Sequence, residues 1–97
     1  MLSVKLHLDR LGTRVEDKVT GFKGILASIS FDLYGCVQGL VNPGADKDGK
    51  LQEQMWFDVA RLACIDSVPV MDRPNFDFGP QAEGRQGAAE KPAPLKS

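Results

Sequence analysis

Nucleophilic catalysis needs a base beside a hydroxyl or a thiol, and this chain offers little of that chemistry. His7 is its only imidazole. Ser28 and Ser30 would act as nucleophiles only if such a base stood next to them, because a serine hydroxyl is a weak nucleophile by itself. No recognisable motif links either serine to His7. The sequence therefore predicts a protein that is not an enzyme.

Metal chemistry is equally poorly supplied. Cys36 and Cys64 lie 28 positions apart, unlike the close cysteine pairs of zinc sites, which also use several imidazoles where cysteines are few. Asp46, Asp48 and Gly49 resemble part of a calcium loop, but the glycine comes too early and no glutamate stands at the twelfth position. We expect two buried free thiols, a solvated hairpin loop, no metal and no cofactor.

Binding is the chemistry that the aromatic and remaining polar residues favour. Trp56 and Phe57 are neighbours on an expected strand, so they point to opposite faces and one of them must meet solvent, a ligand or another subunit. Tyr34 falls at an expected hairpin tip, where a ring with a polar end is typical of a contact surface. Gln38 and Arg61 would supply hydrogen-bond donors nearby. These five residues are the predicted binding set.

Arg61 has two interpretations that the sequence does not separate. Its planar guanidinium could hold a carboxylate or phosphate of a ligand. Alternatively, it could form an ion pair with Asp58 inside the helical turn that Asp58-Val59-Ala60-Arg61 is expected to make, with the aspartate as the N-cap.

Composition excludes several classes of protein. The 97 residues contain 12 Lys and Arg against 13 Asp and Glu, so the chain lacks the basic surface expected of a nucleic-acid-binding protein. No run approaches the roughly 18 apolar residues of a membrane span, and polar residues interrupt the first eleven positions, so we expect neither a transmembrane helix nor a signal peptide. We therefore expect a cytoplasmic protein with no membrane partner.

Apolar residues alternate with polar ones along most of the chain, which is the pattern of half-buried strands. The clearest case covers residues 24–32, followed by a strand at 36–41 that ends at Asn42-Pro43-Gly44. Further strands are expected at 14–18, 51–57 and 62–65, with the helical turn before the last. Five short strands and one helical turn predict an all-β fold, a small and strongly bent antiparallel barrel.

The chain divides into three parts. Residues 1–11 form an N-terminal extension, where Leu2, Val4, Leu6 and Leu8 alternate with polar residues and predict an additional edge strand. Residues 12–72 form the barrel. Residues 73–97 are rich in Pro, Gly and Ala and predict a disordered tail. A folded body this small buries a limited share of its surface, which favours a homo-oligomer.

Several segments carry a resemblance to a known family. The run from Leu11 to Leu26, LGTRVEDKVTGFKGIL, resembles the opening of SH3-like barrels of the KOW kind. Together with YGCVQ at 34–38, DKDGK at 46–50 and WFDVARL at 56–62, it is similar to a family of small uncharacterised proteins of bacteriophages, prophages and other mobile elements. The resemblance covers residues 11–70. It implies a five-stranded SH3-like barrel and a mobile-element origin in a bacterial host, and it supplies no catalytic residue.

Three functions follow from these observations. The first is a non-enzymatic protein-binding or assembly module of phage or mobile-element origin, whose partners include copies of itself. The second is an oligomeric protein that binds or sequesters a small nucleotide, with Arg61 on the phosphate and Tyr34 or Trp56 on the base. Nucleic-acid binding by a KOW-like face is a third and weaker hypothesis, because the charge is balanced.

Overall fold

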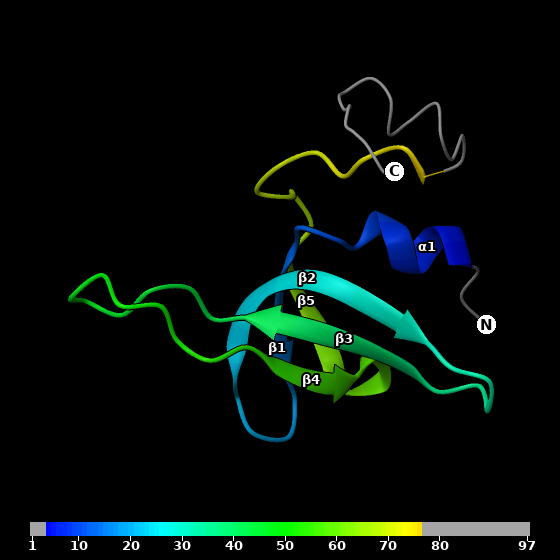
Figure 1. The fold of residues 1–97 in the computed structure, drawn as a ribbon, viewed down its shortest axis with the longest axis horizontal. Coiled ribbons are helices and arrows are strands. Elements are labelled where there is room, and N and C mark those ends of the chain that lie inside the picture. The colour runs from blue at the N-terminus through cyan, green and yellow to red at the C-terminus, as the bar shows by residue number, and fades with distance from the viewer. Residues whose placement is uncertain (1–3, 77–97) are drawn as a thin grey trace, which may run out of the picture.

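A single antiparallel sheet makes up the body of the protein in a computed structural model, which describes residues 4–76 (Figure 1). The strands are β1 (Arg14–Asp17), β2 (Lys23–Phe31), β3 (Val37–Asn42), β4 (Met55–Asp58) and β5 (Leu62–Asp66). The α-helix α1 covers Val4–Asp9, and a 3-10 turn, η1, covers Val59–Arg61. The predicted all-β fold of five antiparallel strands with one short helical turn is confirmed.

The strand order is β4-β3-β2-β1-β5, so β4 and β5 are the two ends of the sheet. The long strand β2 pairs with β1 through its first residues and with β3 along most of its length. A register shift between Leu26 and Ser28 marks an irregularity in β2, and such bulges bend a strand. In Figure 1, β2 curves over the body, while β1 and β5 lie behind it. The turn η1 links the two end strands.

The core lies inside this bend. It consists of one buried apolar side chain from each strand, Val15, Leu26, Val41, Phe57 and Leu62. Gly39 also faces this interior, opposite Ile29 and Phe57. A Cβ at Gly39 would lie 2.6 Å from Cδ1 of Leu26, closer than packed carbon atoms allow, so only glycine lets Leu26 fill this layer.

The N-terminal extension is a helix, so the predicted edge strand is wrong. Two contacts accompany the helical conformation: Lys5 forms an ion pair with Asp9, four positions on, at 2.8 Å, and the buried ring of His7 packs nearly perpendicular to that of Phe31. Leucine and lysine are also good helix formers. The alternation of apolar residues alone therefore does not determine the conformation of this segment. No described helix has the length and apolar character needed to cross a membrane.

Residues 70–76 cross back over the sheet, so the tail boundary predicted at residue 72 falls inside an ordered segment. Val70 donates its N–H to Gly12 O at 2.8 Å, and Arg73 pairs with Asp9 of α1 at 2.9 Å. We call residues 70–76 the strap. The remainder of the predicted tail, from residue 77, lies outside the described residues.

The neighbours Trp56 and Phe57 divide as the alternation of β4 requires, with Phe57 only 9% exposed and Trp56 48% exposed. Phe57→Ala should therefore lower the free energy of unfolding by about 3 to 5 kcal/mol, because a large aromatic leaves the core. Trp56→Ala, the matched control, should change it by less than about 1 kcal/mol. Urea unfolding of both variants measures the difference, and equal losses would contradict this division.

Candidate functional site

A tight turn at the end of the β2–β3 hairpin presents Leu33 and Tyr34. The Asp32 carboxylate organises it: Oδ1 accepts the N–H groups of Tyr34 and Cys36, both at 2.9 Å. The backbone adds Gly35 N–H to Asp32 O and Asp32 N–H to Cys36 O, both at 3.1 Å. Leu33 is 89% exposed and Tyr34 88% exposed. Two large side chains are thus held in water on a turn whose backbone is fixed.

Beside this hairpin tip lies a cleft of about 660 Å³. Three elements form its walls: helix α1 with the residue after it, the hairpin tip with the adjoining ends of β2 and β3, and the turn η1 with its cap. Its apolar lining includes Val4, Phe31 and Val59, and its polar lining includes Arg10, Tyr34, Cys36 and Asp58. We call it the α1 cleft, because helix α1 forms the wall that faces the sheet residues.

His7 lies in the wall of the α1 cleft. Its ring centroid is 5.7 Å from that of Phe31, with the rings close to perpendicular. The Nδ1 atom is buried and has no hydrogen-bond partner among the described residues. A polar atom buried without a partner costs free energy. What His7 contributes to this wall is its ring contact with Phe31.

An ion pair between a buried carboxylate and a half-buried guanidinium joins β1 to η1 at the last residue of the 3-10 turn. Asp17 has no exposed surface, and its Oδ1 and Oδ2 accept Nε and a terminal nitrogen of Arg61 at 2.8 and 2.6 Å. Thr20 donates both its N–H and its hydroxyl to the same carboxylate. The Arg61 guanidinium also lies over the ring of Phe57, 5.2 Å from its centroid. The two side-by-side hydrogen bonds from Arg61 to the Asp17 carboxylate are the strong form of a carboxylate–guanidinium contact.

The hydrogen bonds from Arg61 hold the pKa of the Asp17 carboxyl far below its usual range. Burial acts in the opposite direction, and the donors of Thr20 and Val19 add to the lowering. The same carboxylate raises the pKa of Arg61. Asp17 is consequently ionised throughout the ordinary pH range. This is the state in which both of its oxygens accept hydrogen bonds from Arg61.

Neither interpretation of Arg61 from the sequence describes its main contact. Two nitrogens of the guanidinium are bonded to Asp17, and Asp58 serves a different purpose. The Asp58 carboxylate accepts the N–H of Ala60 at 2.9 Å, so the predicted N-cap is confirmed. Sequence reasoning missed the Asp17 partner because 44 positions separate the two residues.

The structure does not bring the five predicted binding residues into one site. Tyr34 borders the α1 cleft, Gln38 is exposed on β3, and Trp56 is exposed on β4. Phe57 lies in the core, 5.4 Å from Phe22 between ring centroids, and Arg61 is held by Asp17. Of the set, Tyr34 alone belongs to the cleft, together with unpredicted residues such as His7 and Arg10. Helical spacing of Val4, His7 and Leu11 was the available signal for them.

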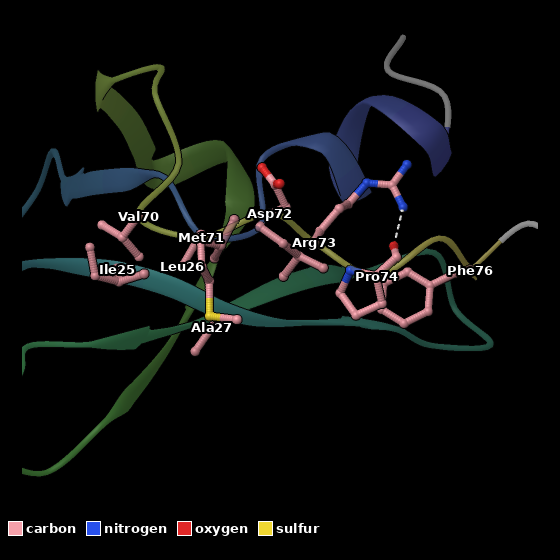
Figure 2. A pocket seen from close by; sticks show the side chains of 11 residues that line it. Ile25, Leu26, Ala27, Val70, Met71, Asp72, Arg73, Pro74 and Phe76 are labelled. Atoms are coloured by element: carbon pink, nitrogen blue, oxygen red, sulfur yellow. Dashed lines mark hydrogen bonds between the residues drawn. The ribbon is translucent and has the colours of Figure 1, made fainter. Parts of the chain in front are cut away.

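A second, smaller groove of about 400 Å³ lies between the strap and β2. Figure 2 shows its lining, with Ile25, Leu26 and Ala27 of β2 beneath Val70 and Met71, and with Pro74 and Phe76 further to the right. Arg73 is occupied there by Asp9 and by Pro74 O. The groove thus presents apolar surface with no unpaired cation from Arg73.

The two cysteines are free, as expected, but both are exposed, so the prediction of buried thiols is wrong. Cys36 sits on the hairpin tip, and Cys64 is on β5 in the half of that strand with exposed side chains.

Comparison of the chain with family models, curated proteins and solved structures gave no match.

Replacing Asp17 by Asn should lower the melting temperature by about 10 °C or more at neutral pH, because Arg61 loses its carboxylate in a half-buried position. The folded pKa of Asp17 lies below the unfolded one, so its stabilisation is full at pH above about 5 and declines as the pH falls below about 4. The gap between wild type and variant should shrink over the same range.

Asp58→Asn is the matched control, since asparagine also caps a helical turn. Thermal unfolding from pH 7 to pH 2 of all three proteins provides the measurement. A gap between wild type and Asp17→Asn that stays constant down to pH 2, or one no larger than that of Asp58→Asn, would contradict the assignment.

Proposed function

We propose that this chain is a non-enzymatic protein-binding module whose contact surface is the hairpin tip and the adjoining α1 cleft. The observation that carries the proposal is the near-complete exposure of Leu33 and Tyr34 on an ordered turn. Large apolar side chains exposed together on a folded surface typically mark contact sites. Tyrosine in addition offers contact area at a low cost in conformational entropy.

The hydrogen bonds around Asp32 support this proposal because they prepare the tip for binding. The carboxylate accepts two backbone N–H groups and the backbone closes the turn with two further bonds. A partner therefore does not have to order the backbone that carries Leu33 and Tyr34, which reduces the entropic cost of association.

The α1 cleft supplies the concave part of such a surface. Val4, Phe31 and Val59 give it apolar walls, while Tyr34 and Arg10 place polar groups at the same site. This combination suits a partner segment that inserts one aliphatic or aromatic side chain and leaves its backbone in hydrogen-bonding reach of the rim. Protein is accordingly the partner class that fits best.

The nucleotide hypothesis is less well supported. Its phosphate ligand was to be Arg61, whose guanidinium is bound to Asp17, and neither Trp56 nor Arg61 lines the α1 cleft with Tyr34. Nucleic-acid binding has the balanced charge of the chain against it. A mobile-element origin remains a prediction from the resemblance, and a reducing cytoplasm is the compartment that suits the two free, exposed thiols.

Selection of peptides from a random displayed library tests the proposal without a known partner. Wild type should enrich peptides that carry a large apolar residue and bind with Kd in the micromolar range, typical of small transient contacts. The double variant Leu33→Ser, Tyr34→Ser should bind them at least about tenfold more weakly, because it removes the exposed anchors. Unchanged melting of this variant shows that the fold is kept.

Val19→Ser is the matched control, since Val19 is similarly exposed but lies in the turn between β1 and β2. Peptides that bind the double variant as well as wild type would place the contact surface elsewhere. No enrichment over an unrelated bait would overturn the proposal.

A further inference from the structure

The hydrogen-bond pattern of the hairpin determines which way the backbone of β4 faces. Asp32 donates its N–H to Cys36 O, and in an antiparallel pair such bonded positions recur at every second residue. Gln38 and Leu40 therefore bond to β2, and Gly39 and Val41 bond to β4.

Leu26 gives an independent check on this assignment. It pairs with Val41 in register. However, its N–H is donated to Thr13 O at 2.9 Å, and its C=O accepts the N–H of Gly12 at 2.8 Å. Its backbone thus faces away from β3, as the alternation requires.

The same alternation carries across to β4. Gly39 is opposite Phe57 and Val41 is opposite Met55, so Phe57 and Met55 are the residues bonded to β3. The N–H and C=O of Trp56 point the other way, to the outer edge of the sheet. Because β4 ends the strand order, that edge is open.

The other end strand, β5, differs from β4 at Leu62, whose outward backbone groups are covered. Lys18 donates its N–H to Arg61 O, so by the same alternation the backbone of Leu62 on β5 faces outward. There, Leu62 O accepts a terminal nitrogen of Arg10 at 3.2 Å, and Leu62 N–H is donated to Val59 O. The outward backbone groups of Leu62 are thus occupied by the chain itself, whereas no such contact is seen for Trp56 among the described residues.

The open edge carries few of the residues that usually protect one. Residues 52–58 read QEQMWFD, with no lysine or proline, whereas natural edge strands commonly carry lysine, other charged residues or proline against strand-to-strand pairing. The charged residues of this segment, Glu53 and Asp58, stand on either side of Trp56 and not at it. Trp56 is instead half exposed beside the open backbone groups. An open edge with a large aromatic fits strand addition by another chain.

We propose that a second copy of this chain pairs with β4 edge to edge, antiparallel, with Trp56 opposite Trp56. The two Trp56 residues then exchange both backbone hydrogen bonds, and their side chains lie on the same face of a continuous ten-stranded sheet (twice the five strands of one copy). A two-fold axis passes between them, as in most homodimers.

Strand length favours this register, and the charges of the strand are compatible with it. It places Gln54 opposite Asp58, so that an amide meets a carboxylate and no two acidic residues face each other. Moving the axis to Phe57 would bring the first residue of η1, Val59, into the pairing, where the backbone is no longer extended. Moving it to Met55 would put a residue from before β4 in every bonded pair, whereas the Trp56 register needs only Gln54 from that segment.

Self-pairing through β4 goes beyond the proposed function, because it uses neither Leu33 nor Tyr34. Sedimentation equilibrium should show a reversible dimer. Amide hydrogen exchange followed by NMR should show the Trp56 N–H slowing as the protein concentration rises. The Met55 and Phe57 N–H groups should be protected at every concentration, since they bond to β3 within one copy.

Trp56→Lys should weaken dimerisation by about tenfold or more, because two lysines would stand opposite each other at the axis. Ile65→Lys is the matched control: Ile65 is 52% exposed on the other end strand, and its replacement should leave the dimer unchanged. Wild type that stays monomeric at millimolar concentration would overturn the inference.

A dimer in which the Trp56 amide exchanges at the same rate as in the monomer would also overturn it and would assign self-association to a different face. Both outcomes leave the peptide-binding test of the hairpin tip unaffected.

Discussion

The buried carboxylate of Asp17 is the constraint on which the rest of the fold depends. A charge with no exposed surface is stable only if its oxygens are fully hydrogen-bonded, and here the donors come from the turn after β1 and from Arg61 of η1. Satisfying one side chain therefore fixes where the 3-10 turn stands against β1. Arg61 in that position also covers the ring of Phe57, which ties the ion pair to the apolar core.

The placement of η1 determines what each surface can do. It directs the chain from β4 to β5 with Leu62 inside the core and Val59 in the wall of the α1 cleft. Helix α1 and the residue after it complete the β5 edge and the α1 cleft. Arg10 donates to the outward carbonyl of Leu62, and His7 of the helix packs on Phe31 in the cleft wall. These contacts leave the hairpin tip and the β4 edge uncovered, and they are the two surfaces to which we assign binding.

The sequence predicted what depends on local pattern. Alternation identified β2 and β3, and the Asp58 cap identified the 3-10 turn, because each signal lies within a few residues. It failed for α1, where the same alternation lies in a helix that contacts Phe31 and Arg73 of the strap. Adjacency showed that Trp56 and Phe57 must separate but not which one enters the core, since that depends on the register of β4 against Gly39. The Asp17–Arg61 pair has no local signal at all.

The state of Asp17 is the most direct test of this account. A carbon-detected NMR titration of its carboxyl group follows ionisation in the folded protein, with no need to unfold it. Because the Arg61 guanidinium lowers the Asp17 pKa, the carboxyl signal should not shift between about pH 6 and pH 3, where an ordinary aspartate titrates with a pKa of about 3.9. A midpoint near that ordinary value would show that Arg61 does not hold Asp17, and would contradict the account at its base.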